Sequence, residues 1–343
     1  MTARNEIRRH PAASLSLAAA VRGGWGGGTE ALRSLAPFAR RGVLLTGTAS
    51  GYDAAIAGTD LFRRAGIPAR AADARLILAG EIPMPDPEML IFAVSCSDDL
   101  SDTQALCWAL RNHPGLVTVS VHGSPVSEYG AVRLDLCACR DTVFPTTTYV
   151  NACAAFWFAS RLLSGGTDED IAGICDLVRA YGYIQEAFGD SGVPAVLRMR
   201  EQMQPGDKVI IAFPDGVFGG EHLRRLLRLL AAREDGPGQI LLCTPDAFPA
   251  LDGHTLVVMP DFLPEHRETI DRADGMIRRS GARTILLTNR DLASGEGRLA
   301  VRLGCRTAES ALLCQVIPVE MFCASFLDPR EDFLKADAGT PGT

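Results

Sequence analysis

Short apolar runs alternate with longer segments of helical character along the first half of the chain. The runs have the length of buried strands, and they lie at residues 43–45, 67–70, 89–94, 116–121 and 131–137. The helical segments between and after them lie at residues 54–62, 104–112 and 149–163. Strands that alternate with helices predict a parallel sheet whose two faces are both covered by helices.

The second half of the chain repeats this pattern after a polar, glycine-containing joint at residues 164–170. Further strands are predicted at residues 208–213, 239–243, 255–259 and 284–288, and helices at 171–188, 221–232, 265–280 and 308–326. A helical lead-in, broken by a glycine-rich stretch at 23–28, occupies residues 1–40. Two halves of similar size and pattern indicate a duplicated α/β domain, with a boundary near the joint.

Composition narrows the class of protein. The chain has 343 residues, 47% of them hydrophobic, which is enough for two α/β domains. Its net charge of −7 argues against a nucleic-acid partner, and the lack of a run of eighteen apolar residues argues against a membrane span. Arg8-Arg9 before an alanine-rich stretch only loosely imitates a twin-arginine export signal, so we expect a cytoplasmic protein.

The ten cysteines and two lysines carry further information. No Cys-x-x-Cys pair occurs, and Cys137 and Cys139 alternate on a predicted strand, which is poor zinc spacing. We therefore expect free thiols in a reducing compartment, with neither a metal nor a cofactor. Lys208 and Lys335 stand among 32 arginines, and a lysine kept in so arginine-rich a chain is a candidate functional residue.

Three turns of small or hydroxyl-bearing residues each precede a predicted helix. The first is Gly47-Thr48-Ala49-Ser50-Gly51, the second runs from Ser95 through Cys96 and Ser97 to Thr103, and the third is Thr146-Thr147-Thr148. Backbone N–H groups at a helix N-terminus, together with the helix dipole, favour an anion, and small residues let a ligand approach closely. Ordinary tight turns between strand and helix remain the alternative interpretation.

In order and spacing these segments resemble the sugar isomerase (SIS) domain family, and specifically the isomerase half of glucosamine-6-phosphate synthases (glutamine–fructose-6-phosphate aminotransferases). Glu6-Ile7 with Pro11 resembles the family's entry motif, residues 47–52 its first sugar-phosphate turn, and residues 95–103 its phosphate loop. Thr146-Thr147-Thr148 resembles the segment before an apolar helix, and Pro318 resembles a position in the final helix. The likeness covers nearly the whole chain.

The resemblance implies two tandem SIS domains, each a three-layer α/β/α sandwich around a parallel five-stranded sheet, in a homodimer. The domains would span residues 29–165 and 195–327, with a lead-in at 1–28 and a tail at 328–343 that closes over the site. Substrate-binding residues would be Ala49, Ser50, Ser95, Cys96, Ser97 and Thr147. The family's base falls opposite Glu234 in an ungapped count from residues 257–260, and its tail lysine opposite Lys335.

The sequence departs from the family pattern at several of these positions. Asp98 stands in place of glycine and Leu100 in place of the phosphate-binding threonine, and the count puts Cys243 opposite the family's histidine. A carboxylate beside a phosphate would be repulsive, unless Asp98 only stabilises the helix that follows. Glycine and proline next to Glu234 do not suit a helix, so the sequence favours an exposed loop glutamate over a base at this position.

We therefore expect an enzyme for a sugar phosphate or amino-sugar phosphate that works through a C1–C2 enediol or enolamine, as an isomerase, deaminase or deglycase. It would lack a glutaminase half, because no N-terminal cysteine is present. His222 and His254 are candidates to replace the missing histidine. Two alternatives stay open: a sugar-phosphate-binding protein without catalysis, or a scaffold redirected to a biosynthetic reaction on a modified substrate.

Overall fold

The computed structural model describes residues 3–96, 101–139, 146–191, 193–214, 219–231, 233–234, 236–303, 313–314 and 316–327, with side chains at all of these except 3–4, 101 and 183–191. The chain divides into two compact units. One unit is Arg9–Gly182, and the other combines Met1–Arg8 with Tyr183–Thr343. The first is called the front unit here, and the second the rear unit.

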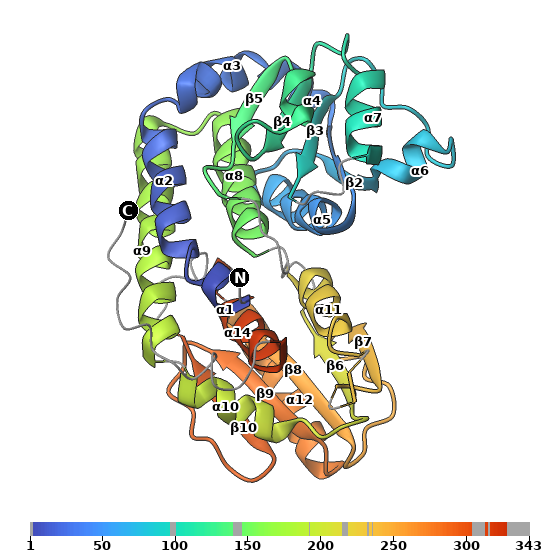
Figure 1. Ribbon diagram of the computed structural model, residues 1–343, viewed down its shortest axis with the longest axis vertical. Coiled ribbons are helices and arrows are strands. Elements are labelled where there is room, and N and C mark those ends of the chain that lie inside the picture. Colours follow the sequence, from blue (N-terminus) through green and yellow to red (C-terminus); the bar gives the residue numbers. More distant parts are fainter. Residues whose placement is uncertain are drawn as a thin grey trace. The chain divides into compact units, whose positions relative to one another are not determined.

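The front unit contains a parallel five-stranded sheet in the order β2-β1-β3-β4-β5 (Figure 1). Its strands are β1 (Val43–Gly47), β2 (Ala69–Asp73), β3 (Leu90–Ser95), β4 (Leu116–Ser120) and β5 (Val132–Asp135). β1 pairs with β2 on one side and with β3 on the other, with Val43 opposite both Ala69 and Leu90. Strands β1, β3 and β4 are buried along their whole length, as their continuous apolar pattern requires.

Helices cover both faces of this sheet. On one face, α5 (Ala49–Arg64) packs against α8 (Thr147–Leu163), and Phe92 of β3 meets Phe62 of α5 and Phe156 of α8 at ring-centroid distances of 5.3 and 5.8 Å. On the other face, α6 (Ala74–Leu78), α7 (Ser101–Ala109) and the 3₁₀ helix η2 (Pro125–Glu128) enclose a second apolar cluster. The result is a three-layer sandwich.

The predicted helical lead-in is confirmed, and it is more broken than the sequence indicated. It comprises α1 (Ala3–Ile7), α2 (His10–Arg22), the 3₁₀ helix η1 (Trp25–Gly27), α3 (Gly28–Ser34) and α4 (Ala36–Arg41). The predicted helix over 29–40 is split at Leu35, two residues before Pro37, because proline lacks the N–H that a continuous helix needs. Helices α2 and α3 pack on α8 in the front unit, and α1 packs on α14 in the rear unit.

The rear unit repeats the architecture with the sheet order β10-β9-β8-β6-β7. Its strands are β6 (Lys208–Ala212), β7 (Gln239–Cys243), β8 (Thr255–Asp261), β9 (Arg283–Thr288) and β10 (Arg298–Arg302). Helices α11 (Gly220–Arg228) and α14 (Val316–Leu327) pack together, with α10 (Val193–Gln202) on α14, while α12 (Arg267–Arg279) covers the other sheet face beside the 3₁₀ helix η3 (Pro264–His266). The unit boundary falls inside α9 (Asp168–Ser191), which begins with Thr167 and Asp170 exchanging capping hydrogen bonds.

The prediction of an α/β fold built on parallel five-stranded sheets is confirmed. Both sheets have the same order when their strands are numbered along the chain, with the first strand between the second and the third. The predicted strand over 131–137 was too long: β5 ends at Asp135, and Cys137 lies beyond it with a φ of +51°. The sequence also gave no sign of β10, an edge strand.

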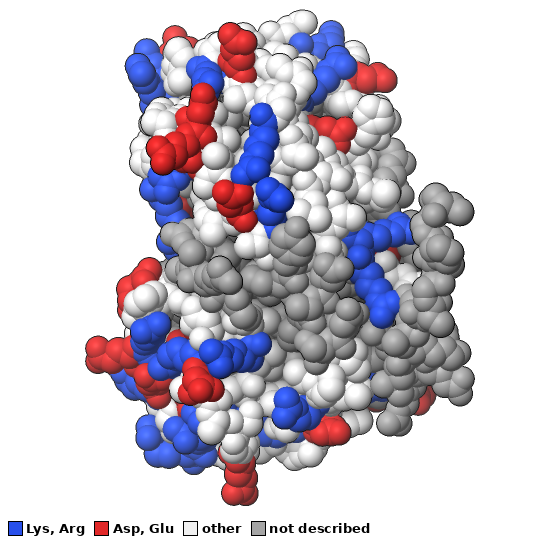
Figure 2. Space-filling model, turned by 90° about the vertical axis from the view of Figure 1, so that its left-hand side faces the viewer, with Lys and Arg blue, Asp and Glu red and all other residues white. Residues whose placement is uncertain are grey.

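The described surface carries charges of both signs. Among the described residues, Figure 2 shows acidic and basic side chains interspersed on the face drawn there. Within the described ranges, no helix combines the length and the apolar character that a bilayer crossing requires.

Candidate functional site

The strand order marks where a ligand is expected to bind in the front unit. The connection after β1 leads to β2 on one side of the sheet, and the connection after β3 leads to β4 on the other side, so these two connections diverge. In open parallel sheets, ligands bind in the crevice that opens at such a point, beyond the carboxyl ends of the strands. The turn after β1 and the end of β3 are therefore the first places to examine.

The turn after β1 is pressed against the end of β3. A Cβ atom added to Gly47 or to Gly51 would lie 2.6 Å from the carbonyl oxygen of Val94 in each case, so neither position has room for a side chain. Thr48 is the N-cap residue of α5, and Ala49, the first residue of that helix, has a φ of +48°. A left-handed conformation at a non-glycine residue is a strain that persists only where the surrounding structure enforces it.

The end of β3 is tied to the first turn of α8. The Thr148 hydroxyl donates to the carbonyl oxygen of Cys96 at 2.8 Å, and the Cys96 thiol lies 3.6 Å from the carbonyl oxygen of Thr148. Across the turn, the hydroxyls of Thr48 and Thr103, which lies in α7, are 3.1 Å apart. Side chains from four elements thus hold the N-terminal ends of α5, α7 and α8 around the carboxyl ends of β1 and β3.

This arrangement suits an anionic ligand. The N-terminal turn of each helix carries unpaired backbone N–H groups and the positive end of the helix dipole. No acidic residue occupies the first turn of α5 or of α8. Several such helix ends directed toward one region form the type of site at which proteins bind phosphate groups.

The hydroxyl-bearing side chains of the site are buried. Ser50 is 1% exposed, Thr147 2% and Ser95 6%. Among the described residues the Ser50 hydroxyl has no hydrogen-bond partner, although a buried polar group normally has one. The Ser50 hydroxyl, at the N-terminus of α5, therefore has hydrogen-bonding capacity that the described residues leave unused.

A buried polar cluster lies behind this turn. Burial, with Cys153, Asp53 and Cys96 nearby, raises the pKa of the Tyr149 phenol well above its ordinary value. Burial likewise raises the pKa of the Cys153 thiol to about 12, although Tyr149 is its hydrogen-bond partner. Both groups are therefore neutral at physiological pH, and neither thiol nor phenol is a nucleophile here.

Most predicted substrate-binding residues of the front unit lie together. A Cβ atom added to Gly51 would be 3.8 Å from the backbone nitrogen of Cys96, which places the turn with Ala49 and Ser50 beside the end of β3. Thr147 lies near the end of β3 as well, because the hydroxyl of its neighbour Thr148 donates to the carbonyl oxygen of Cys96. Ser97, the altered positions Asp98 and Leu100, and Lys335 lie outside the described residues.

Glu234 does not lie at the carboxyl edge of a sheet. It is exposed, in the connection between α11 and β7, where the backbone N–H of Gly206 meets the carbonyl oxygen of Gly236 at 3.0 Å. That connection leads into the strand, so it is at the amino edge of the rear sheet. Cys243, at the end of β7, is at the carboxyl edge, and His254, which precedes β8, is exposed at the amino edge.

His222 is fully buried, and it has a partner that the sequence analysis did not anticipate. Its Nε2 atom lies 3.5 Å from Oε1 of Glu320, and both side chains are 0% exposed. Glu320 sits in the largely apolar helix α14, and an acidic side chain buried in such a segment normally has a hydrogen-bond partner. No group of three or more potential metal ligands occurs within the described parts of the chain.

These features define an α/β protein of two doubly wound units, with a polar, anion-favouring site at the carboxyl edge of the front sheet. No protein-family profile matches the sequence, and no curated protein sequence matches it. Solved structures match its fold, and they include SIS-domain phosphosugar isomerases. The resemblance seen in the sequence is confirmed for the fold.

Three of these structures illustrate the likeness. The C-terminal domain of glucosamine-fructose-6-phosphate aminotransferase from Francisella tularensis aligns with a TM-score of 0.78 at 14% identity, over 93% of each chain. Tagatose-6-phosphate ketose/aldose isomerase from Escherichia coli gives 0.71 at 16% identity, over 93% of this chain and 90% of that one. Glucosamine-6-phosphate deaminase from Thermotoga maritima gives 0.62 at 15% identity, over 87% and 90%.

Proposed function

We propose that this protein binds a sugar phosphate or amino-sugar phosphate at the carboxyl edge of the front sheet and transforms it through a C1–C2 enediol or enolamine. The single observation that carries the proposal is the convergence of the β1–α5 turn, the end of β3 and the start of α8 around buried hydroxyls. The names of the three matched structures refer to sugar phosphates or amino-sugar phosphates, which supports the substrate class.

The proposal includes roles for the predicted residues. Ala49, Ser50, Ser95, Cys96, Ser97 and Thr147 would surround the phosphate and the hydroxyls of the sugar. Lys335 would close the site and stabilise negative charge on the enediolate, as a closing segment that excludes water does. In this proposal the chain consists of tandem SIS domains at 29–165 and 195–327, acts as a cytoplasmic homodimer, and uses its tail, 328–343, as the closing segment.

The proposal leaves the identity of the general base open. A general base must come within hydrogen-bond reach of the carbon whose proton it removes. Glu234 remains a prediction from the ungapped count, and its exposed place at the amino edge of the rear sheet lends it no support. Glu234→Gln abolishes turnover if Glu234 is the base and leaves kcat unchanged if it is a loop residue.

Turnover assays with three substrates test the function. Fructose 6-phosphate, glucosamine 6-phosphate and a fructosamine 6-phosphate cover isomerisation, deamination and deglycation, and product formation is followed by NMR. Conversion of one of them that depends on the phosphate is the expected result. Failure of all three both to be converted and to raise the Tm of the protein would overturn the proposal.

A binding protein without catalysis is the second candidate. The exposed position of Glu234 at the amino edge of the rear sheet favours this candidate. Glu234 is the carboxylate that the sequence analysis predicted to act as base, and no other was predicted. Thermal shift separates the two, because a sugar phosphate that raises Tm without being converted indicates a sensor. A redirected scaffold would instead respond to a modified or unphosphorylated sugar.

A further inference from the structure

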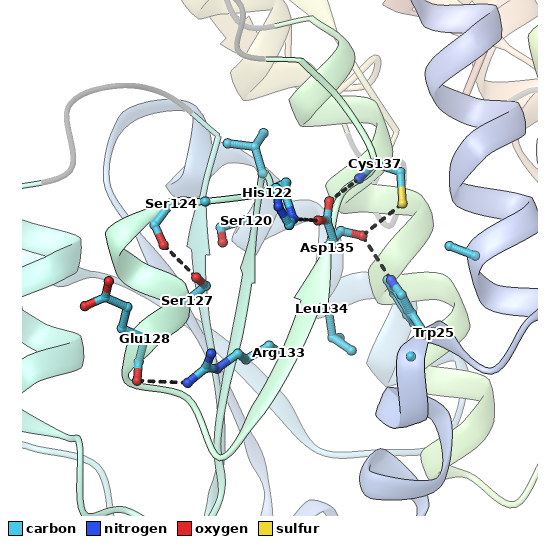
Figure 3. A pocket seen from close by; sticks show the side chains of 14 residues that line it. Trp25, Ser120, His122, Ser124, Ser127, Glu128, Arg133, Leu134, Asp135 and Cys137 are labelled. Carbon is cyan, nitrogen blue, oxygen red and sulfur yellow. Dashed lines mark hydrogen bonds and ion pairs between the residues drawn. The ribbon is translucent and has the colours of Figure 1, made fainter.

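A cavity of about 560 Å³ opens in the front unit at the carboxyl ends of β4 and β5 (Figure 3). Its size lies within the range of small-molecule sites in proteins. It adjoins the site described above, because β4 pairs with β3 and Ser120 lies opposite Ser95, and it extends from there toward β5, away from β1. Residues from η1, the end of β4, the β4–η2 connection, η2 and β5 line it, and its polar lining includes Ser120, His122, Ser124, Glu128 and Asp135.

Asp135 is fixed in this cavity from several sides. Its Oδ2 atom lies 3.1 Å from Nδ1 of His122, and its Oδ1 atom accepts the backbone N–H of Cys137 at 2.7 Å. The indole N–H of Trp25 donates to its carbonyl oxygen at 3.0 Å. The carboxylate is nevertheless 36% exposed, so each oxygen retains acceptor capacity toward the cavity.

The walls of the cavity contain strained backbone. Among the described residues, the non-glycine positions with positive φ are Trp25 at +50°, Cys137 at +51° and Ala49 at +48°. The first two line this cavity, and the third begins α5 at the proposed substrate site. Because such conformations cost free energy, their occurrence here supports a functional role for the cavity.

The polar lining indicates the chemistry of a ligand. Ser120 and Ser124 contribute hydroxyls, and the buried Ser124 hydroxyl has no hydrogen-bond partner among the described residues. Within the same described ranges the Glu128 carboxylate forms no ion pair, while the Arg133 guanidinium donates to the backbone carbonyl oxygen of Glu128 at 3.3 Å. Two carboxylates against one guanidinium disfavour a phosphate and favour a cation.

The apolar part of the lining adds a surface on which a ring can pack. Val121, Leu134 and Trp25 form it, and Trp25 is held by its hydrogen bond to Asp135. An apolar wall beside hydroxyls and a carboxylate matches a molecule with a hydrophobic ring face and a polar rim. We propose that this cavity binds an unphosphorylated amino sugar, whose ammonium group pairs with Asp135 and whose hydroxyls bond to Ser120, Ser124 and His122.

The test measures binding of D-glucosamine to the full chain by titration calorimetry. N-acetylglucosamine is the comparison, because it keeps the ring and hydroxyls and loses the charge. We expect glucosamine to bind at least about tenfold more tightly, the size of a charge-assisted hydrogen bond. Equal affinity of the two sugars, or no measurable heat with glucosamine at millimolar concentration, overturns the proposal.

Variants locate the site. Asp135→Asn should weaken glucosamine binding at least about tenfold, while the matched control Glu81→Gln, an exposed carboxylate of the same unit, should leave it unchanged. Should Asp135→Asn fold poorly, Ser124→Ala removes a hydroxyl that has no hydrogen-bond partner among the described residues, so it should cost little stability and still weaken binding severalfold. Binding that survives both changes places glucosamine elsewhere and refutes the assignment. Sugar-phosphate turnover is a separate readout, so its failure leaves this test intact.

Discussion

At the scale of single residues, a substitution at Ser50 should change the affinity for a ligand without changing the stability of the protein. Its hydroxyl is buried without a partner among the described residues, so Ser50→Ala should change the Tm little. A hydrogen bond to a charged phosphate group would be lost, and the affinity for a sugar phosphate should fall about tenfold. Calorimetric titration of the variant with fructose 6-phosphate measures the change.

Ser160→Ala is the matched control for Ser50→Ala. Ser160 is equally buried, on α8, and its hydroxyl donates to the carbonyl oxygen of Trp157 at 2.8 Å. This variant should cost about 1 kcal/mol of stability and leave the affinity unaffected. An unchanged affinity in Ser50→Ala would remove Ser50 from the site.

His10 predicts how stability depends on pH. Its imidazole is fully buried, 3.3 Å from the Tyr181 hydroxyl, and burial lowers its pKa from 6.5 to about 3. Between pH 6.5 and about 3, the unfolded chain therefore carries a proton on His10 that the folded chain does not. The contribution of the neutral, buried imidazole to stability is thus fully present above pH 6.5 and is lost as the pH falls toward 3. From pH 7 to pH 5 the free energy of unfolding should fall by about 2 kcal/mol through His10 alone.

Urea denaturation at the two pH values, for the wild type and His10→Gln, measures this contribution. The variant is expected to be less stable at pH 7 and to lose less stability on acidification, because glutamine does not titrate. Parallel pH profiles for the two proteins would show that His10 is not the responsible group.

At the scale of elements, the turn between β1 and α5 depends on glycine. Gly51→Ala places a Cβ atom 2.6 Å from the Val94 carbonyl oxygen, so the turn or β3 must shift. We expect a loss of about 1–3 kcal/mol, typical of overpacking, and a weaker affinity for sugar phosphate because the ligand-binding turn moves. Thermal denaturation with and without the ligand measures both effects.

Gly173→Ala provides the control for this substitution. Gly173 lies exposed within α9, and a Cβ atom there would meet nothing within 4 Å. Alanine should raise the stability of that helix by up to about 1 kcal/mol. Loss of stability in both variants would show that the close approach at Gly51 is not the cause.

The elements that sequence reasoning found are those with continuous apolar runs. Strands β3 and β4 were predicted within one residue at each end, because burial on both faces makes every position apolar. The β10 sequence, Arg298-Leu-Ala-Val-Arg302, has polar ends and a half-exposed pattern, so nothing distinguished it from a loop. Cys137 alternates like a strand residue, yet the bond from its N–H to the Asp135 side chain ends the strand.

The candidate site was predictable only in part, because some of its contacts join residues that are distant in sequence. Small and hydroxyl-bearing residues before helices mark the three turns, and Ala49, Ser50, Cys96 and Thr147 lie where the pattern placed them. The link between Thr48 and Thr103 and the pairing of His222 with Glu320 join residues far apart in sequence. Such contacts depend on tertiary packing, and no local pattern encodes them.

At the scale of the whole molecule, the repeated sheet order is the main result. In both sheets the first strand lies between the second and the third and the chain follows the same path, although the identity to the matched structures is 14–16%. Similar folds at such low identity fix the architecture and leave the chemistry to particular residues. The substrate and reaction of this chain therefore have to be established through its own side chains.

The two lysines of the chain offer a whole-molecule test of the proposed closing tail. If Lys335 folds over the bound sugar and stabilises the enediolate, Lys335→Ala should lower kcat by about 100-fold or more while KM changes little, because the phosphate-binding turns of the front unit are untouched. Steady-state kinetics on whichever sugar phosphate is converted, supported by calorimetric binding, separates the two parameters.

Lys208→Ala is the control for a change in lysine content alone. Lys208 begins β6, at the amino edge of the rear sheet, and its ammonium group donates to the carbonyl oxygen of Ala250. Its removal should affect stability slightly and leave kcat as it is, because the amino edge is remote from the carboxyl ends of the strands where ligands bind. Equal losses of kcat in both variants, or no loss in Lys335→Ala, would contradict a closing role for the tail. Binding of a sugar phosphate without turnover in the wild type would instead identify the protein as a sensor.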